Sequence, residues 1–459
     1  MKISDTICAI STAPGIGAIA IIRAAGKDCF SLAGKLFQSE INLLQLPAQK
    51  AKFTEIYEGS QLLDQVVITK FDASHSYCGE DMLEIACHGS IYIQQKIVEL
   101  LLNAGCRMAE PGEFTMRAFL NGKMDLPQAE AVADLIESQS ETSHRLAINQ
   151  LKGQFTSKLQ QLRAQLLELV TFLELELDFS EEEVEFADHS RFLSLLADMD
   201  NEVIFLLDSF KLGNVLRTGI PVAIIGKPNV GKSTLLNCLI EDDRAIVSHI
   251  PGTTRDTIED TFNIDGITFR FIDTAGIRTA KDEIENFGIE RTYKAIEKAD
   301  VIFYLIDITQ TAVEDVENEL VFLENNIDLS AKKCIVVANK IDLLNKIPYA
   351  FGRWNELDIA YISAKRKVNI NILQDMLLDY VNKRHIADAT LLTNTRHYDV
   401  MLKLYDCIKR LKNGFREQRS ADLLSIDMRE ALQNIGLATG EISTEEILGN
   451  IFGRFCIGK

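Results

Sequence analysis

The first 120 residues alternate between two hydrophobic patterns. Short unbroken apolar runs, typical of buried strands, occur at 16–23, 66–71 and 83–87. Between 91 and 103, apolar residues instead recur at every third or fourth position, which predicts a helix. Strands and a helix within one short segment predict a compact α/β domain at 1–120.

Two longer segments carry only the helical period. At 155–177, apolar residues recur at intervals of three or four, which predicts a helix long enough to build a bundle. The same period returns at 401–408 and at 424–435. We therefore predict a discontinuous helical domain, with a first part at 121–216 and a second part at 381–459.

Glycine and polar residues predict where the last helices end. Gly436 follows an apolar helical run and is predicted to be its C-cap. Ser443 and Glu446 have the spacing of a capping box ahead of a short apolar helix. This helix is predicted to end near the tail at 456–459, whose sequence is Cys-Ile-Gly-Lys.

Between the two helical parts, residues 217–380 alternate short apolar runs with helical ones. Such alternation predicts a mostly parallel sheet covered by helices on both faces. The fold class is therefore multidomain, α/β plus all-α. The predicted strands are at 222–225, 269–272, 301–306, 335–338 and 360–362.

Composition adds several exclusions. The chain of 459 residues is about three times as long as a typical domain, and no apolar stretch approaches the about 18 residues of a membrane span. No signal-peptide charge pattern is present at the start, so a soluble, cytoplasmic protein is expected. The nine cysteines lack paired spacing and are expected to be free thiols. The net charge of -19 argues against strong nucleic-acid binding without a partner.

An acidic cluster near the end of the first long helix is open to two interpretations. It could bind a metal, but a solvated helix end is the more common role of such a charge run. Zinc is not expected, because there is no Cys-x-x-Cys pair and Cys87 and His88 are adjacent. The cluster comprises Asp178, Glu181, Glu182, Glu183, Glu185 and Asp188.

Residues 226–233 carry the clearest chemical motif. Their sequence, GKPNVGKS, fits the phosphate-binding pattern G-x-x-x-x-G-K-[ST] between a predicted strand and a predicted helix. The glycines let main-chain N–H groups turn towards phosphates. Lys232 would bring a cation to the β and γ oxygens, and Ser233 would offer a hydroxyl to Mg²⁺.

Four further motifs follow in the order that a GTPase requires. Residues 252–254 and 273–276 have the composition of loops that sense Mg²⁺ and the γ-phosphate. In the Asn-Lys-Ile-Asp motif, Asp342 can accept from the N1–H and 2-amino groups that guanine has and adenine lacks. Ser-Ala-Lys at 363–365 adds a main-chain N–H for the guanine 6-oxo group. The predicted GTP-binding residues are Asn229, Val230, Gly231, Lys232, Ser233, Thr234, Ser248, His249, Ile250, Pro251, Gly252, Thr253, Thr254, Asp273, Thr274, Ala275, Gly276, Asn339, Lys340, Asp342, Ser363, Ala364 and Lys365.

The residue that orients water in Ras-like GTPases is missing. Those proteins have a glutamine after the Asp-x-x-Gly turn, whereas this chain has Ile277, which cannot form a side-chain hydrogen bond. Asp282, Glu283 and Glu285 follow as candidates to replace it. Asn229 could also help to bind a monovalent cation beside the phosphates.

With these motifs, the whole chain resembles the MnmE (TrmE) family of tRNA-modification GTPases. It departs from the family pattern at Ser90, where a second glycine is usual, and at Ser248, where threonine is frequent. Outside the GTPase motifs, the resemblance rests on stretches at 77–81, 87–89, 111–123, 128–132, 178–182 and 455–459.

The resemblance implies an N-terminal domain that binds a tetrahydrofolate and dimerises, and a GTPase domain at 217–380 inserted into the helical domain. It also implies an FAD-containing partner, MnmG, in a heterotetramer or larger complex. Together they would add an aminomethyl or carboxymethylaminomethyl group to carbon 5 of the wobble uridine of certain tRNAs. The one-carbon unit would come from 5-formyl- or methylene-tetrahydrofolate, with GTP, K⁺ and Mg²⁺ required.

The resemblance further assigns residues by motif position. Glu285 would orient the attacking water, and Cys456 would serve the modification chemistry. The folate contacts would be Arg23, Glu80, Lys123 and Lys459. Mg²⁺ would be held by Ser233 and Thr254. K⁺ would be held by Asn229, Ser248, Ile250 and Thr253.

Two other functions stay open from the residues alone. A ribosome-assembly or signalling GTPase would use hydrolysis only as a switch, but neither flank is strongly basic or carries a KH-type G-x-x-G loop. A one-carbon enzyme regulated by its GTPase domain is the second alternative. Tight folate binding would distinguish both an MnmE-type enzyme and such a one-carbon enzyme from a GTPase that acts only as a switch.

Overall fold

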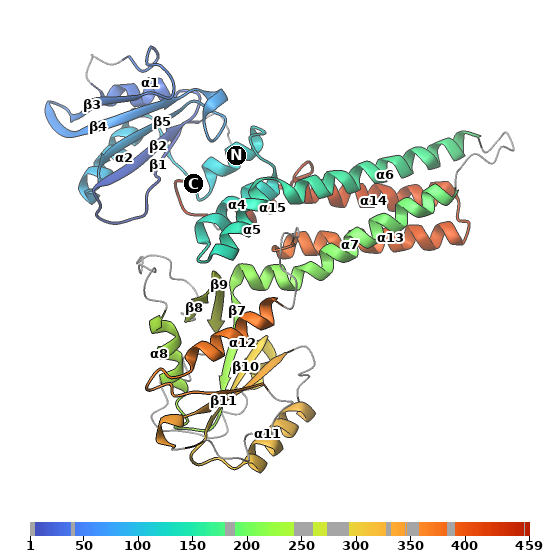
Figure 1. Cartoon of the computed structure of the whole chain (residues 1–459). Helices are drawn as coiled ribbons and strands as arrows, with labels where there is room; N and C mark the ends of the chain where they lie inside the picture. Colours follow the sequence, from blue (N-terminus) through green and yellow to red (C-terminus); the bar gives the residue numbers. More distant parts are fainter. Residues whose placement is uncertain are drawn as a thin grey trace. The chain divides into compact units, whose positions relative to one another are not determined.

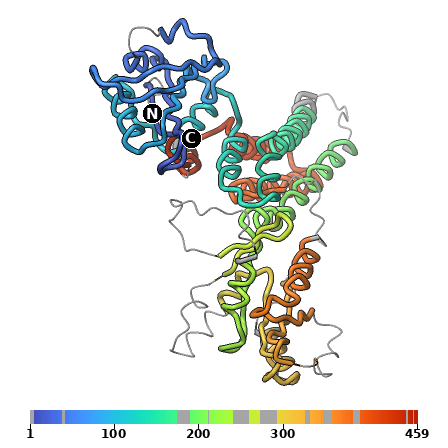
Figure 2. The backbone as a smooth tube through the Cα atoms, turned by 60° about the vertical axis from the view of Figure 1, so that its left-hand side comes forward, coloured from blue at the N-terminus to red at the C-terminus, as the bar shows by residue number. Residues whose placement is uncertain are grey.

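The chain folds into two compact units in the computed structural model (Figures 1 and 2). The first unit comprises Met1–Ile136, Ile148–Ile204 and Asp399–Lys459, and the second comprises Glu137–Ala147 and Phe205–Tyr398. The chain therefore leaves the first unit twice and returns to it twice. The structure describes residues 5–37, 42–179, 189–242, 260–272, 293–326, 332–344, 346, 358–382, 391–453 and 455–459.

A six-stranded sheet forms the N-terminal part of the first unit, in the order β3-β4-β5-β2-β1-β6. Its described strand pairs are antiparallel except β1 with β6. Alternate residues of the strands face two separate cores, and helices α1 and α2 contribute to one of them. The elements are β1 (Ile7–Ile10), β2 (Ile19–Ala25), α1 (Cys29–Ala33), η1 (Gly34–Leu36), β3 (Ala51–Glu58), β4 (Gln61–Phe71), η2 (Ala73–His75), β5 (Met82–His88), α2 (Ile91–Ala104), β6 (Arg107–Met108) and α3 (Glu113–Leu120).

Long helices form the rest of the first unit, and Figure 1 shows α6, α7, α13 and α14 running alongside one another. The rings of Phe192 on α7 and Phe415 on α13 stack with centroids 4.4 Å apart. Arg410 on α13 reaches α14 with two ion pairs of 2.6 Å. The predicted discontinuous bundle is therefore confirmed. The helices are α4 (Leu126–Glu137), α5 (Glu141–Leu151), α6 (Gln154–Phe179), α7 (His189–Thr218), α13 (Thr395–Arg416), α14 (Ala421–Thr439) and α15 (Glu445–Phe452), of which most of α5 and the part of α7 from Phe205 onward belong to the second unit.

None of the helices in the described part of the chain combines the length and the apolar character that a membrane crossing requires.

The second unit contains another six-stranded sheet, in the order β12-β11-β10-β7-β9-β8. The described pairs are parallel except β8 with β9. One core takes Leu235 from α8 and Leu373 from α12, and a second core takes Ile296 and Val316. The predicted mostly parallel sheet, covered on both faces, is confirmed. Its elements are β7 (Ile220–Ile225), α8 (Lys232–Asp242), β8 (Thr261–Ile264), β9 (Ile267–Phe271), β10 (Val301–Asp307), α11 (Val313–Asn326), β11 (Lys333–Asn339), η3 (Ile341–Leu343), β12 (Ile359–Tyr361) and α12 (Ile370–Asn382).

The predicted end of the long helix after residue 420 is wrong. Gly436 lies inside α14, which continues to Thr439 and is capped by Gly440, with φ of +86°. A Cβ at Gly436 would lie 3.0 Å from Cδ1 of Ile442, so this glycine makes room for a packed side chain. The glycine at 440 takes the left-handed conformation that a helix C-cap favours.

The predicted capping box of the last helix is also wrong, by one residue. Thr444 is the N-cap of α15, and its hydroxyl accepts from the N–H of Ile447 at 3.3 Å. Ser443 therefore precedes the cap, and the third helical position belongs to an apolar residue. Two adjacent hydroxyl residues are equally suited to capping, so the spacing to Glu446 misled the prediction.

Candidate functional site

The phosphate-binding motif forms the loop between β7 and α8. Gly226, Asn229 and Gly231 have φ of +139°, +62° and +105°. A Cβ at Gly226 would lie 2.1 Å from the main-chain oxygen of Leu305, and one at Gly231 would lie 2.4 Å from Nδ2 of Asn339. Since only glycine fits at these two positions, the loop conformation follows from the motif.

Lys232 begins α8, and its ammonium group reaches back over the loop. Nζ donates to the main-chain oxygen of Gly226 and, at 3.1 Å, to that of Lys227. Burial lowers the pKa of Lys232 below its ordinary value of 10.5. Ser233 and Thr234 follow it and are exposed. The loop thus gathers a partly desolvated cation and two accessible hydroxyls, a set that suits a polyphosphate and its Mg²⁺.

Asn339, at the end of β11, joins three of the predicted motifs. Its side chain is buried, Nδ2 donates to the main-chain oxygen of Val230 at 2.8 Å, and Oδ1 accepts from the N–H of Ala364 at 3.0 Å. One amide therefore holds the phosphate loop, the Asn-Lys-Ile-Asp turn and the Ser-Ala-Lys loop together.

Asp342 is the predicted guanine-selecting residue of this assembly. Oδ1 accepts from the hydroxyl of Ser363 at 2.7 Å, and Oδ2 lies 3.4 Å from Nε of Arg366. The Ser363 hydrogen bond, with the nearby positive charges of Arg366 and Lys365, holds the pKa of Asp342 below its ordinary 3.8. The carboxylate is therefore kept in the acceptor form that guanine recognition needs.

The neighbouring Lys340 adopts a φ of +69°, and its Nζ forms an ion pair of 2.6 Å with Asp307 at the end of β10. The hydrogen bonds from Lys340 and Thr309 to Asp307 outweigh the effect of its burial and lower the pKa of its carboxyl. This pair ties the base-recognition turn to the next strand of the sheet.

A large part of the predicted nucleotide site lies outside the described residues. Within the described part of the chain, no three His, Cys, Asp or Glu side chains gather as a metal site. Ser233 is the described member of the predicted Mg²⁺ pair, and Asn229 is that of the K⁺ group. Outside the described residues are Ser248, His249, Ile250, Pro251, Gly252, Thr253, Thr254, Asp273, Thr274, Ala275, Gly276, Ile277, Asp282, Glu283 and Glu285.

The predicted folate residues lie in the first unit. Arg23 on β2 donates from Nε and Nη2 to Oε1 of Glu84, at 3.1 and 2.6 Å. Its guanidinium carbon lies 5.6 Å from the ring centroids of both Tyr77 and Phe114. Arg23 is therefore fixed by one carboxylate and two aromatic rings.

The C-terminal tail docks beside the N-terminal sheet, as the chain end in Figure 2 shows. The N–H of Phe114 donates to the main-chain oxygen of Lys459 at 3.1 Å, and the hydroxyl of Ser11 donates to that of Gly458 at 3.0 Å. Gly458 has φ of +96°, and a Cβ there would lie 2.2 Å from the main-chain oxygen of Ile10. Lys459 and Arg23 thus both contact Phe114.

Cys456 presents its thiol from this docked tail. All nine cysteines lie among the described residues and are free thiols, and only Cys456 is exposed. Its main-chain oxygen accepts from the N–H groups of Gly112 and Lys459, both at 3.4 Å. The tail therefore holds the backbone of Cys456 while its sulfur remains accessible.

The other two predicted folate residues are held separately. Oε2 of Glu80 accepts from Nη1 of Arg117 on α3 at 2.7 Å. Nζ of Lys123 donates to the main-chain oxygen of Ser74 at 2.6 Å. The structure therefore links Arg23, Glu80 and Lys459 through α3, and the ammonium group of Lys123 contacts η2.

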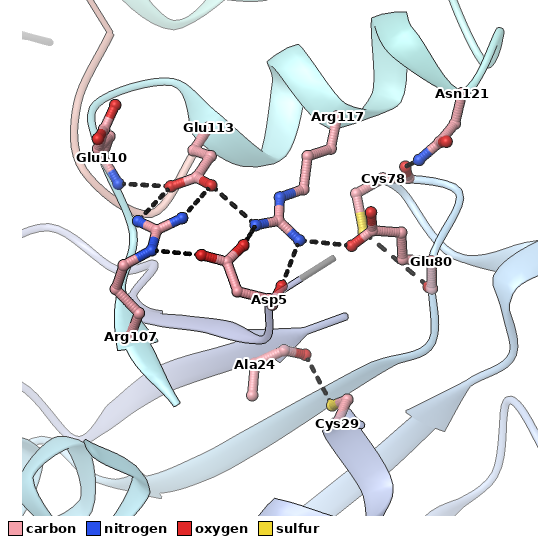
Figure 3. Close-up of polar contacts among 10 residues, drawn as sticks. All are labelled: Asp5, Ala24, Cys29, Cys78, Glu80, Arg107, Glu110, Glu113, Arg117 and Asn121. Atoms are coloured by element: carbon pink, nitrogen blue, oxygen red, sulfur yellow. Dashed lines mark hydrogen bonds and ion pairs between the residues drawn. The ribbon is translucent and has the colours of Figure 1, made fainter. Parts of the chain in front are cut away.

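An ion-pair network around α3 was missed by the sequence reasoning (Figure 3). Nη2 of Arg117 lies 2.8 Å from Glu113 and 2.9 Å from Asp5, and Nη1 of the same side chain binds Glu80. Arg107 pairs with Glu113 at 2.7 Å and with Asp5 at 2.8 Å. The side chains of Arg117 and Glu113 are each only 2% exposed. Their i,i+4 spacing on one helix was the available signal.

Burial opposes ionisation of Glu113, but hydrogen bonds from Arg107, from the N–H of Glu110 and from Arg117 outweigh it. Together they lower the pKa of this carboxyl below its ordinary 4.5. Asp5 likewise has a lowered pKa, mainly because Arg107 donates a hydrogen bond to it. The carboxyls of Asp5 and Glu113 are therefore ionised at neutral pH.

Comparisons with known proteins cover nearly the whole chain. Family models described as "GTP-binding protein TrmE N-terminus" and "MnmE helical domain" match residues 6–123 and 126–456. The tRNA modification GTPase MnmE of Flavobacterium psychrophilum is 46% identical over 459 residues, covering 99% of both chains. That of Flavobacterium johnsoniae is 47% identical over 465 residues, again covering 99% of both. That of Bacteroides fragilis is 46% identical over 471 residues, with the same coverage.

Proposed function

The chain belongs to the MnmE family of tRNA modification GTPases, and from this premise we propose that it hydrolyses GTP while modifying carbon 5 of the wobble uridine in certain tRNAs. The observation that carries the nucleotide part is the buried amide of Asn339, which holds the phosphate loop and both guanine-recognition loops together. Three motifs read from the sequence thus converge on one site.

In this proposal the residues of the nucleotide site have distinct tasks, whether or not they lie among the described residues. Lys232 stabilises charge on the β- and γ-phosphates, and Asp342 selects guanine. Ser233 and Thr254 would hold Mg²⁺, which supplies charge neutralisation between the phosphates when bound. Glu285 would orient the attacking water.

We further propose that the segment at 1–120 binds a tetrahydrofolate and forms a homodimer, and that an FAD-containing MnmG partner completes the modifying complex. Arg23, Glu80, Lys123 and Lys459 would contact the folate. The support is chemical fit: a guanidinium and two aromatic rings lie beside the docked Lys459. Arg23 and Lys459 offer cations for the carboxylates of such a ligand. Tyr77 is partly exposed, whereas Phe114 is buried and supports Arg23 from the core. The bound folate would supply the one-carbon unit.

The direct test is mass spectrometry of wobble uridines in tRNA from a strain that lacks this protein. The modified nucleoside should disappear and return when the gene is restored. Restoration with Lys232→Ala should fail, because that variant loses the phosphate-binding cation. Normal modification in the deletion strain would refute the proposed function.

Potassium dependence is a separate proposal that rests on Asn229 and on the missing glutamine at Ile277. K⁺, held by Asn229, Ser248, Ile250 and Thr253, would provide positive charge beside the phosphates. We expect faster GTP turnover in K⁺ than in Na⁺, since the smaller ion fits the same oxygen cage poorly. Equal rates in both salts, or an Asn229→Ala enzyme that keeps its K⁺ response, would contradict this.

We also propose that Cys456 takes part in modification and not in GTP hydrolysis. The docked tail exposes its thiol, which could act as a nucleophile or a proton donor. Cys456→Ser should abolish the modified nucleoside while GTP turnover and folate binding persist. A variant that modifies tRNA normally would exclude the role, whereas lost GTP turnover would reveal coupling between the tail and the nucleotide site.

A further inference from the structure

Of the predicted folate residues that helix α3 contacts, Glu80 and Lys459 are hydrogen-bonded to it and come from distant parts of the chain. Glu80 is bound by the side chain of Arg117, and Lys459 is bound by the N–H of Phe114. The first contact belongs to the middle of the helix and the second to its first turn. A change in the position of α3 would therefore alter the hydrogen bonds of both Glu80 and Lys459.

Arg117 is the centre of the contacts that fix this helix (Figure 3). Its guanidinium donates to the carboxylates of Asp5, Glu80 and Glu113 and to the main-chain oxygen of Asp5. Because Arg117 is almost fully buried, these partners replace the water that it has lost. Removing the cation would leave Glu80 without this ion pair and would leave the buried Glu113 with Arg107 as its ion-pair partner, which is unfavourable.

The path from Arg117 to the tail is short and uses named hydrogen bonds. Glu113, held by Arg117, is the first residue of α3, and its carboxylate also accepts from the N–H of Glu110 at 2.8 Å. The residues on either side of Glu113 bind the tail: Gly112 donates to Cys456, and Phe114 donates to Lys459. The carboxylate of Glu113 thus fixes the turn whose N–H groups hold the tail.

We propose that Arg117 is a positioning residue that couples Glu80 to the docking of the C-terminal tail through the first turn of α3. Arg117 contacts neither the tail nor the proposed folate directly. It acts on the folate site through Glu80 and on the tail through Glu113. The coupling to the tail stands on the structure alone. The coupling to the folate rests on the proposed function.

Tail docking can be measured with a nitroxide spin label on Cys456 in a Cys334→Ser background, since Cys334 is partly exposed and the other seven cysteines are buried. In the full-length protein the label should move slowly, because the tail is hydrogen-bonded at Gly458 and Lys459. Arg117→Met should raise the mobile fraction of the label about threefold to thirtyfold, the range by which such network residues shift a local equilibrium. Arg117→Lys keeps the charge and should restore part of the slow component.

Two further variants serve as positive and negative controls for the mobility of the label. Gly458→Ala should release the tail without touching the ion pairs, since its Cβ would collide with Ile10. Arg191→Met removes an arginine that pairs with Glu168 on the helical bundle and should leave the label slow. If Arg117→Met unfolds the domain, Glu80→Gln and Arg117→Lys provide the milder comparison. A slow label in a folded Arg117→Met protein would overturn the proposal.

A second arm uses equilibrium binding of 5-formyl-tetrahydrofolate to the same proteins. Arg117→Met should weaken binding about tenfold, and adding Glu80→Gln should weaken it little further, because the two side chains act together. Additive losses, or unchanged affinity in Arg117→Met, would overturn the coupling to the ligand. If the unaltered protein binds no folate, the proposed function fails at this site, and the spin label alone decides the tail coupling.

Discussion

Two sites of this chain are assembled in opposite ways: the nucleotide site, and the tail site, by which we mean the Arg117 ion-pair network, the first turn of α3 and the docked tail at 456–459. The nucleotide site uses loops that follow strands β7, β11 and β12 of one parallel sheet, and such loops meet at the same edge. The tail site combines residues from Asp5 to Lys459, which only the complete fold of the first unit brings together. In the nucleotide site, the residues of each motif are consecutive in the sequence. In the tail site, the interacting residues come from distant positions in the sequence.

The two sites also differ in what holds them. In the nucleotide site, glycine conformations and one buried amide fix the loops. In the tail site, a network of two arginines and three carboxylates fixes α3, and main-chain hydrogen bonds then fix the tail. Hence the nucleotide site should be sensitive to local shape, and the tail site to charge and pH.

The largest expected effect is a change of base specificity at the nucleotide site. Asp342→Asn replaces an acceptor by an amide, so it should weaken GTP binding on the order of a hundredfold or more and favour xanthosine triphosphate. Competition binding with both nucleotides measures this. Asp358→Asn, the same substitution beside Lys333 in the same unit, should leave GTP affinity unchanged. Unaltered GTP affinity in Asp342→Asn would remove the argument for guanine selection.

A smaller effect should appear when the pH falls. The folded-state pKa values of Asp5 and Glu113 are depressed, so their stabilisation is present above the ordinary values of 3.8 and 4.5 and is lost as pH falls through the depressed ones. The protection factors of the N–H groups of Gly112 and Phe114, that is, their exchange rates relative to the intrinsic rate at the same pH, should therefore fall below about pH 4.5. Arg117→Met should flatten this dependence. Protection factors that do not change with pH in the unaltered protein would contradict a charge-held tail.

The described loops of the nucleotide site could be predicted from the sequence because their chemistry is local. Gly226, Gly231 and Lys232 are needed within one loop, and each position allows few residue types. The strands before each motif could be read as apolar runs, because both faces of the sheet are buried. Side chains outside the described residues, such as Glu285, stay predictions.

The tail site could be approached only through resemblance. Arg117 and Glu113 have the spacing of an ordinary surface pair on a helix, and nothing local shows that they are buried or that Asp5 and Glu80 join them. Burial depends on the packing of α3 against β1, β2 and β5, which the periodic pattern does not specify. The predictions for Gly436 and Ser443 were wrong for a related reason. Gly436 makes room for the side chain of Ile442 inside α14, and the adjacent Thr444, not Ser443, caps α15.

The smallest expected effect concerns the cap of α15, the helix that precedes the tail. Thr444→Ala removes the hydroxyl that accepts from Ile447, which should cost about 1 kcal/mol of local stability. Phe452, at the end of α15, packs against Phe455 with ring centroids 5.6 Å apart, so fraying of the helix would loosen the approach to the tail.

The spin label on Cys456 should therefore become slightly more mobile in Thr444→Ala, and far less so than in Gly458→Ala. Ser443→Ala is the matched control, because it removes a hydroxyl one residue away that does not cap the helix. Equal effects of the two alanine substitutions would mean that the cap is shared between them. A larger effect in Thr444→Ala than in Arg117→Met would reverse the order of importance that the ion-pair network implies, and would place the control of the tail in α15.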